Sequence, residues 1–317
     1  MSDFDKVQIR KIDENHHGQR IDNYLFNQLK GVPKSRVYRI LRKGEIRVNK
    51  KRVKAEYKLQ SGDSLRIPPI RLEEKAETPK IHNLDRVQQL ESLIIDETPQ
   101  YLILNKPSGM AVHGGSGVSF GVIEALRALR PREKFLELVH RLDRDTSGCL
   151  LVAKRRTYLT HFHELLRSKT MQKEYLALVI GEWDNEKNLI NAPLKKNQLR
   201  SGERFVSVDK TGKPSETRFK CLKRLGQFSL IKAMPMTGRT HQIRVHAQYA
   251  GYPLLGDDKY VLNDEQRQLA EELNVKTFCL HASKLTFSLP DSTQKIFYEA
   301  PMPQLMNQLI EKLKVSN

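Results

Sequence analysis

The sequence predicts an α+β fold, in which helices pack on a mixed β-sheet and a small α/β module precedes the main unit. Strand and helix candidates do not alternate strictly along the chain, as a doubly wound parallel sheet would require. The 317 residues suffice for one large or two ordinary domains. No apolar run approaches the roughly 20 residues that a membrane-spanning helix needs, and the acidic start, Met1 to Asp5, lacks an apolar signal core. We therefore expect a cytoplasmic protein without a membrane partner.

The formal net charge of +18 indicates a polyanionic partner, because a field of this sign attracts polyanions and speeds their encounter with the protein. Residues 31–58 hold eleven Lys or Arg against two Glu, so half of the excess charge lies in this one stretch. No amphipathic face with Trp or Phe accompanies the charge, which favours nucleic acid over a membrane surface.

Two short helices are predicted in the N-terminal region. The first covers residues 18–29, with its apolar residues on one face, and Pro33 interrupts it. The second has Ser35 as a plausible N-cap and ends at Gly44. On this second helix a basic stripe, separate from the apolar stripe, is formed at spacings of three and four by Arg36, Arg39 and Lys43.

Short strands are predicted after these helices. Residues 46–48 alternate between apolar and basic, Asn49 and Lys50 can form a turn, and Val53 begins a return strand. Residues 61–63 form a second turn before the alternating residues 65–67. A helix with one apolar and one basic face, followed by a basic hairpin, is a suitable platform for RNA.

Three stretches of this region resemble the S-four-type RNA-binding module, namely GQRIDNYL, SRVYRILRKGEIRVN and GDSLRI. We expect this module to cover residues 1–70; the alternative is a solvated basic helix that binds nothing. The basic side chains expected to contact RNA are Arg36, Arg39, Lys43, Arg47, Lys50, Lys51 and Arg52.

A linker is predicted over residues 71–90, where mixed charges and Pro79 interrupt any apolar periodicity. One larger unit is expected over residues 91–317. Its strand candidates are 101–104, 149–153, 175–180, 228–233 and 284–288. Its helix candidates are 122–129, 158–166, 241–249, 264–273 and 304–314.

The segment HRLDRDTSG, residues 140–148, concentrates two carboxylates, two guanidiniums and an imidazole. Arg141 and Asp143 can point to the same side, and a neighbouring arginine favours an ionised carboxylate that can act as nucleophile or base. The stretch from Asp145 to Gly148 fits a type I turn, with Asp first and Gly fourth. We assign chemistry to Asp143 and structure to Asp145, although either carboxylate could serve.

The segment TGRTHQIRVH, residues 237–246, is the second candidate for chemistry. On a helix His241, Arg244 and Gln248 share a face that could meet the Asp143 carboxylate or an RNA phosphate. His241 and His246 lie five apart rather than four, and the chain has no CxxC or HExxH sequence, so no metal site is predicted. The three cysteines are far apart in sequence, and we expect reduced thiols.

Other enzyme classes are disfavoured by what the chain lacks. The glycine-rich residues 113–117 lack the GK[ST] ending of a P-loop, and a loop near the site that makes backbone contacts is the better interpretation. HRLDRD departs by one residue from the kinase catalytic loop, and no DFG or APE accompanies it. A glycosidase needs a carboxylate pair across a sugar, and the basic patch argues against a neutral oligosaccharide. Tyr175 opens a strand candidate, for which packing is the usual reason.

Five stretches of the chain, NKPSGMAVHGG, HRLDRDTSG, KEYLALV, TGRTHQIRVH and LHA, resemble the RluA family of pseudouridine synthases, and within it the RluC-type branch. The resemblance implies a mixed, largely antiparallel sheet split by a central cleft, and an enzyme that isomerises uridines of large-subunit ribosomal RNA without cofactor or metal. It implies that Asp143 is the essential aspartate and that Arg244 forms an ion pair with it. Arg141 would insert where the target base had stacked, and Tyr175 would lie against the extruded uracil.

The chemistry implied by this resemblance begins with flipping of the nucleotide, which costs a few kcal/mol of stacking and pairing. Asp143 then attacks the sugar or the base, or abstracts a sugar proton, and these three routes remain open. The alternative function is a non-catalytic assembly factor that binds ribosomal RNA. We expect the protein to be a monomer in either case.

Overall fold

The computed structural model describes residues 6–29, 32–70, 89–114, 120–198, 204–261 and 263–315. The described residues fall into two compact units, with the main division at residues 82 and 83. The predicted linker, 71–90, lies outside the described residues except at its last two positions, which are helical. Within the described ranges, no helix combines the length and apolar character needed to cross a membrane.

The N-terminal unit is a four-stranded antiparallel sheet packed against two helices, in the order β1-β4-β2-β3. Its core buries apolar side chains from both helices and the sheet, among them Leu25, Val37 and Leu65. This agrees with the small α/β module that the periodicity predicts. The elements are β1 (Gln8–Lys11), α1 (Ile21–Gln28), α2 (Lys34–Lys43), β2 (Arg47–Val48), β3 (Lys51–Arg52) and β4 (Ser64–Ile67).

Two local predictions in this unit have different outcomes. The N-cap prediction for Ser35 is wrong, because α2 begins one residue earlier and Pro33 precedes it with a φ of −56°, a value that already suits a helix start. The turn at Asn49 and Lys50 is confirmed, with φ of 49° and 68°. Two successive positive φ angles make the type I′ turn whose twist matches a tight hairpin.

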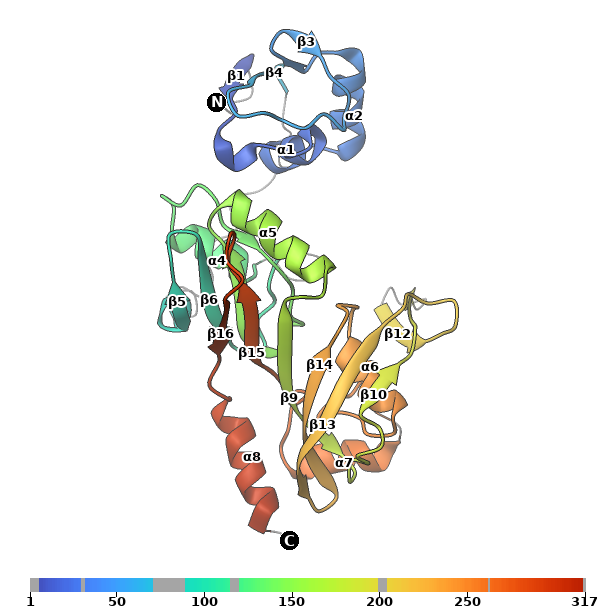
Figure 1. Cartoon of the computed structure of the whole chain (residues 1–317). Coiled ribbons are helices and arrows are strands. Elements are labelled where there is room, and N and C mark those ends of the chain that lie inside the picture. Colours follow the sequence, from blue (N-terminus) through green and yellow to red (C-terminus); the bar gives the residue numbers. More distant parts are fainter. Residues whose placement is uncertain are drawn as a thin grey trace. The chain divides into compact units, whose positions relative to one another are not determined.

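The second unit is built on a ten-stranded mixed sheet (Figure 1). Eight strands follow the order β10-β13-β14-β9-β15-β8-β6-β5, while β16 pairs with β15 and β7 pairs with β8. Among the described strands every pairing is antiparallel except that of β15 with β8. The predicted α+β class with a mixed, largely antiparallel sheet is therefore confirmed.

The sequence candidates for strands and helices in this unit are all found, and every one except the helix at 122–129 has at least one shifted end. Additional strands were not predicted, and the longest of them, β13 (Glu216–Leu225), alternates exposed Arg218 and Lys220 with buried Thr217 and Phe219. The strands are β5 (Ile94–Glu97), β6 (Tyr101–Lys106), β7 (Glu137–Leu138), β8 (Ser147–Ala153), β9 (Gln172–Ile180), β10 (Leu189–Asn191), β13 (Glu216–Leu225), β14 (Phe228–Pro235), β15 (Leu280–Ser288) and β16 (Lys295–Glu299). The helices are α4 (Val122–Leu129), α5 (Arg156–Arg167), α6 (Gln242–Tyr249), α7 (Asp264–Glu272) and α8 (Gln304–Val315), and a separate hairpin joins β11 (Leu194–Gln198) to β12 (Arg204–Val208).

The register of β9 divides this sheet into two halves. β9 pairs with β15 from Gln172 onward, but its pairing with β14 starts only at Tyr175. The two halves therefore diverge beside the first residues of β9, with β13 and β14 on one side and β15 on the other (Figure 1), and β8 follows β15 in the strand order. Each half has its own buried core, one around Tyr101, Phe162 and Phe287 and the other around Leu178 and Leu255.

Candidate active site

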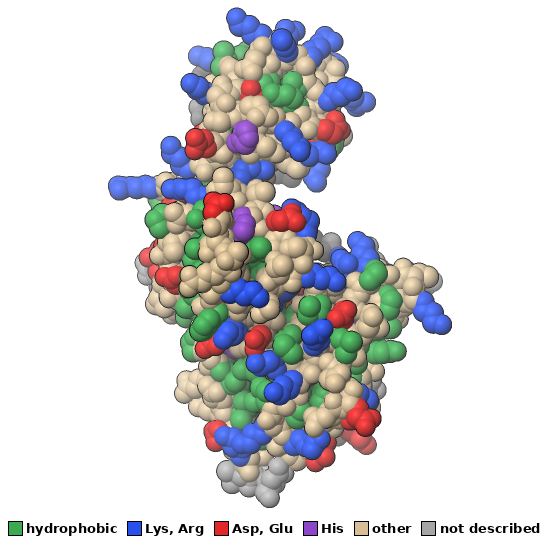
Figure 2. Space-filling model, in the orientation of Figure 1, with side chains coloured by type: hydrophobic (Ala, Val, Ile, Leu, Met, Phe, Trp, Pro, Cys, Tyr) green, Lys and Arg blue, Asp and Glu red, His purple; other side chains and the backbone are tan. Residues whose placement is uncertain are grey.

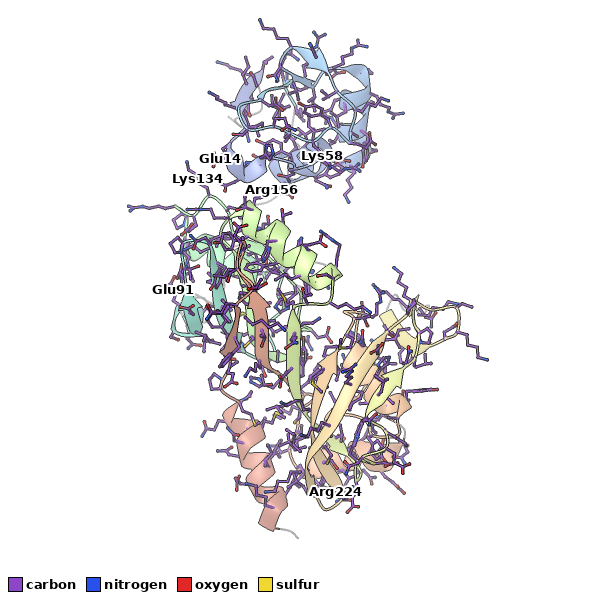
Figure 3. All side chains as sticks on the ribbon, in the orientation of Figure 1. Glu14, Lys58, Glu91, Lys134, Arg156 and Arg224 are labelled. Carbon is purple, nitrogen blue, oxygen red and sulfur yellow. The ribbon has the colours of Figure 1, made fainter. Side chains whose placement is uncertain are left out.

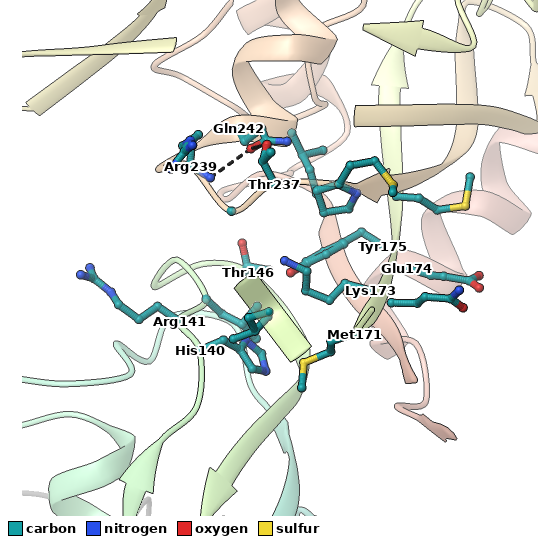
Figure 4. Close-up of a pocket in the computed structure, with 18 of the residues that line it drawn as sticks. His140, Arg141, Thr146, Met171, Lys173, Glu174, Tyr175, Thr237, Arg239 and Gln242 are labelled. Carbon is teal, nitrogen blue, oxygen red and sulfur yellow. Dashed lines mark hydrogen bonds between the residues drawn. The ribbon is translucent and has the colours of Figure 1, made fainter. Parts of the chain in front are cut away.

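The divergence of the strands leaves a cavity of about 820 Å³ in the second unit. Three segments far apart in the sequence line it: the loop before β8, the start of β9, and the connection from β14 to α6 (Figure 4). These segments carry the HRLDRDTSG, KEYLALV and TGRTHQIRVH sequences. The structure thus brings Asp143, Tyr175 and Arg244 to one place, together with Arg141.

Asp143 lies in a turn, and its carboxylate faces the cavity. The turn is closed by the amide of Thr146, which donates to the Asp143 carbonyl at 3.2 Å. The Asp143 side chain is 32% exposed, and its Oδ2 lies 3.7 Å from Nη1 of Arg244. A carboxylate beside a guanidinium and open to a cavity is available for nucleophilic or base chemistry.

The predicted turn from Asp145 to Gly148 is wrong, because the turn spans Asp143 to Thr146 and β8 begins at Ser147. Gly148 is required for a different reason. Its φ is +106°, and a Cβ at this position would lie 2.2 Å from the carbonyl oxygen of Ala282. Ser147 and Gly148 form the parallel pairing of β8 with β15, so the glycine permits close approach of two strands.

Arg244 is held in place by the carboxylate of Asp257, which the sequence analysis did not identify. Its Nε and Nη2 donate to the two oxygens of Asp257, both at 2.7 Å. Arg244 is 7% exposed and Asp257 is fully buried. Burial lowers the pKa of Arg244, but the hydrogen bond and charge of Asp257 outweigh it and raise the pKa above its usual value. The bidentate pair leaves Nη1 as the nitrogen that faces Asp143.

The Arg244 guanidinium is also enclosed by two aromatic rings. Its central carbon lies 4.2 Å from the ring centre of Phe278 and 4.8 Å from that of Tyr260. Such stacking favours a planar cation. The position of Arg244, and through it the environment of Asp143, is therefore fixed by side chains that follow α6 in the sequence.

Tyr175 and Arg141 differ in their exposure. Tyr175 is buried on β9, and burial and then the charge of Asp143 raise its pKa well above the usual value. It therefore carries its proton at neutral pH. Arg141 is exposed, and its side chain extends away from Tyr175 (Figure 4). Arg141 therefore adds an exposed cation to the lining of the cavity.

Lys106 connects the NKPSG sequence to the Asp143 turn. Its ammonium group is buried and donates to the carbonyls of Pro107, Met110 and Arg144, each at 2.8 Å. Burial lowers the pKa of Lys106 to about 7. One side chain thus fixes the NKPSG loop and the Asp143 turn together. The loop predicted at residues 113–117 lies outside the described residues from position 115 onward.

His140 makes the stability of this unit depend on pH. Its Nε2 accepts from the amide of Leu151 at 3.2 Å, and burial lowers its pKa to about 3. The ring stays neutral in the folded state while the unfolded state takes up a proton below its ordinary pKa of about 6.5. We expect the unfolding free energy to fall as pH is lowered from 6.5 toward 3.

The measurement is urea unfolding at pH 7 and pH 4.5 for the wild type and for His140→Gln, whose side-chain oxygen accepts the same amide proton without titrating. We expect the acid loss to shrink by on the order of 2 kcal/mol in the variant, less than a sealed site would give because the ring borders the cavity. An acid loss as large in His140→Gln as in the wild type would contradict this assignment.

Within the described ranges, the structure brings no side chains together into a site for metal binding or for reactive thiols. No group of three or more His, Cys, Asp or Glu side chains there is placed to hold a metal ion. All three cysteines are free thiols. Burial raises the pKa of Cys149 and Cys279 to about 12, so both thiols stay protonated.

The basic residues expected to contact RNA lie on the N-terminal unit. Figure 2 shows Lys and Arg side chains gathered on the visible face of this unit. Lys58, from the same basic stretch of 31–58, is exposed as well (Figure 3). Arg36 is half-buried, and the exposed members of the predicted set are Arg39, Lys43, Arg47, Lys50, Lys51 and Arg52.

Comparison with known proteins gives matches over both units. The family described as RNA pseudouridylate synthase matches residues 100–249, and the S4 domain family matches residues 19–65. A Haemophilus influenzae protein named ribosomal large subunit pseudouridine synthase C is 56% identical over 98% of this chain and 96% of its own length. The Escherichia coli K12 protein of the same name is 55% identical over 97% of each chain.

The fold is also similar to that of solved structures. Human RNA Pseudouridylate Synthase Domain Containing 4 matches with a TM-score of 0.58 and 22% identity, over 72% of this chain and 95% of that chain. Human RNA Pseudouridylate Synthase Domain Containing 1 matches with a TM-score of 0.54 and 24% identity, over 70% of this chain and 94% of that chain. At 22% and 24% identity, these similarities are evidence for the fold alone.

Proposed function

The chain belongs to the RNA pseudouridylate synthase family, and we propose that it converts uridines of large-subunit ribosomal RNA to pseudouridine with Asp143 as the essential carboxylate. The observation that carries the proposal is the position of Asp143 at the cavity, 3.7 Å from the buried Arg244. The names of the relatives from Haemophilus influenzae and Escherichia coli support the ribosomal large subunit as the substrate.

The proposed reaction starts with extrusion of the target nucleotide, because its glycosidic bond is otherwise hidden in folded RNA. Phosphate contacts of Lys and Arg side chains offset the free energy lost in unstacking. We assign Arg141 to the gap that the base leaves, since this side chain is exposed and lines the cavity. The uracil would enter beside Tyr175, among side chains that include Leu142, Met171 and Ile243.

Bond rearrangement at the extruded nucleotide then depends on Asp143. The carboxylate attacks the sugar or the base, or removes a sugar proton, and the bond from uracil nitrogen 1 to ribose carbon 1′ breaks. The uracil rotates in the cavity, carbon 5 bonds to carbon 1′, and the carbon 5 proton passes to a base. Tyr175 keeps its proton at neutral pH, because burial and Asp143 raise its pKa, and so acts as a hydrogen-bond donor beside the uracil.

We further propose that the protein is a monomer and acts on ribosomal RNA in the cytoplasm. The free thiols are consistent with a reducing compartment. No step assigned above requires a second copy of the chain, because all the named groups come from one unit.

The proposal is tested with large-subunit ribosomal RNA transcribed with uracil tritiated at carbon 5. Formation of pseudouridine releases this label to water, and we expect release to require the protein. Mapping of pseudouridine in ribosomal RNA from a strain that lacks the gene identifies the target uridines. Protein that binds this RNA but releases no label would overturn the proposal in favour of a non-catalytic assembly factor.

Neutralising the basic stripe of α2 is expected to weaken RNA binding and its dependence on salt. The variant replaces Arg36, Arg39 and Lys43 with Gln, and each lost phosphate contact lowers the slope of log K against log salt by roughly 0.7 to 0.9, or about 2 to 3 for the triple variant. The measurement is the binding constant for ribosomal RNA between low and physiological salt.

The matched control for this experiment replaces Lys134, Lys220 and Lys295 with Gln, three exposed lysines that line neither cavity. It removes the same net charge from the chain. Equal salt slopes for the two triple variants would show that the α2 stripe makes no special contribution.

A further inference from the structure

His241 stands where two cavities of the second unit meet. A second cavity, of about 750 Å³, adjoins the cavity that contains Tyr175. The side chains that line both are Arg141, Leu142, Asp143, His241 and Arg244, and we call this group the neck. Four of the five have proposed roles, and His241 has none.

The hydrogen bonds of His241 determine which ring nitrogen carries the proton. The amide of Val206 donates to the Tyr260 hydroxyl oxygen at 3.2 Å, and this oxygen lies 2.7 Å from Nδ1 of His241. Tyr260 is 2% exposed, and the described residues offer its hydroxyl proton no acceptor other than Nδ1. Burial raises the pKa of Tyr260 to about 12, so the hydroxyl keeps its proton. The tyrosine therefore donates to Nδ1 and places the imidazole proton on Nε2.

The same contacts keep His241 neutral and fixed. Burial lowers its pKa, against the opposing charge of Asp143. Asp257 anchors the tyrosine by accepting from the Tyr260 amide at 3.2 Å, with the same side chain that holds Arg244. Among the described residues no group bonds to Nε2. A neutral imidazole can donate a hydrogen bond at the neck without attracting the Asp143 carboxylate, which stays paired with Arg244. A cationic imidazolium would compete with Arg244 for this carboxylate.

Both cavities are lined by basic side chains, which suit the negatively charged backbone of RNA. The first also holds Tyr175 with the apolar side chains of Leu142, Met171 and Ile243, which suit the uracil. In the second, Arg144, Lys259 and Lys276 lie with the carboxylates of Asp145 and Asp258. A nucleotide with its base in the first cavity and its glycosidic bond beside Asp143 has its sugar–phosphate at the neck.

We propose that His241 is a substrate-contacting residue whose Nε2–H donates a hydrogen bond to a sugar–phosphate oxygen of the target nucleotide, with Tyr260 as the positioning residue that fixes its tautomer. This inference rests on the proposed function. The role of His241 follows from the reaction, because the uracil is detached from the ribose while it rotates and no longer holds the ribose in place. A donor on the sugar–phosphate keeps carbon 1′ within reach of carbon 5 during that step.

The test compares two variants that differ in where they place an amide nitrogen. In His241→Gln this nitrogen reaches the position of Nε2, whereas in His241→Asn it reaches only that of Nδ1. His241 has a φ of 53°, and asparagine is well tolerated at such angles, so the Asn variant is expected to fold. We expect single-turnover tritium release to fall about 10- to 100-fold in His241→Asn, the effect of one lost hydrogen bond to substrate, and less than about tenfold in His241→Gln.

The acceptor is identified with synthetic RNA hairpins that span a mapped target uridine. One analogue has 2′-deoxyribose at the target and the other has a methylphosphonate on its 5′ side, each removing one acceptor. The wild type is expected to be slowed by one of them, and His241→Asn is expected not to be slowed further by the same analogue. A purely structural role would leave the variant's discrimination equal to that of the wild type.

Three outcomes are distinguishable in this experiment. An active wild type with an equally active His241→Asn variant overturns the inference alone. A slow Asn variant that still discriminates against both analogues as the wild type does also overturns it. A wild type that releases no tritium overturns the proposed function, and the inference with it.

Discussion

Replacement of Asp143 with asparagine is expected to lower tritium release from ribosomal RNA by about 10⁴-fold or more, the scale seen when an essential reacting group is removed. Asparagine has the same shape but cannot act as a nucleophile or a base at neutral pH. The fold is expected to persist, because the Asp143 side chain is one-third exposed and the turn is closed by its backbone carbonyl. The measurement is single-turnover release, with RNA binding and thermal unfolding recorded for the same protein.

The matched control is Asp145→Asn, which makes the same substitution two residues further on. The Asp145 carboxylate accepts from the Arg144 side chain at 3.1 and 3.2 Å and has no contact with Arg244. We expect this variant to retain activity within about tenfold, because the pair is open to solvent at Arg144, which is 63% exposed, and such ion pairs contribute little. Activity retained in Asp143→Asn but lost in Asp145→Asn would reverse the assignment.

Replacement of Arg244 with methionine is expected to remove activity and to destabilise the second unit. The substitution leaves Asp257 buried without its partner, and breaking a buried pair in this way costs about 3–5 kcal/mol of unfolding free energy. Activity falls for a separate reason, since Nη1 no longer lies beside the Asp143 carboxylate. Urea unfolding and tritium release measure the two effects independently.

The double variant Arg244→Met with Asp257→Asn separates stability from catalysis. The introduced asparagine is uncharged, and its side-chain oxygen can still accept from the amides of Lys259 and Tyr260 that Asp257 binds. We expect much of the lost stability to return while tritium release stays absent. Recovery of activity along with stability would show that Arg244 acts only as a structural support.

Local sequence patterns predict much of the fold because they reflect local energetics. The apolar periodicity of residues 122–129 matches α4 at both ends. Gly44 ends α2 with a φ of 70°, as its place after the last apolar residue predicts. The unpredicted strands have a different character. β13 buries only alternate residues, and its other face carries lysines and arginines. Its sequence alone therefore resembles that of a solvent-exposed segment, and only its pairing with β14 and β10 identifies it as a strand.

The turn at Asp143 shows where local patterns mislead. The Asp-to-Gly spacing from Asp145 to Gly148 fits a turn, but Gly148 is required by contact with Ala282, which lies 134 positions further along the chain. A turn pattern describes only four consecutive residues. The neighbouring strand that needs a glycine cannot be inferred from them.

Local patterns and the family resemblance predict the α+β class, the basic stripe on the second helix, and the residue types of the candidate site, Asp143, Tyr175 and Arg244. How these groups are held is visible only in the folded chain. Asp257 accepts two hydrogen bonds from Arg244, Tyr260 fixes the tautomer of His241, and the register of β9 opens the cavity at Tyr175. Burial, strand register and hydrogen-bond partners join residues distant in the chain, and periodicity and spacing cannot show them because they describe only neighbours.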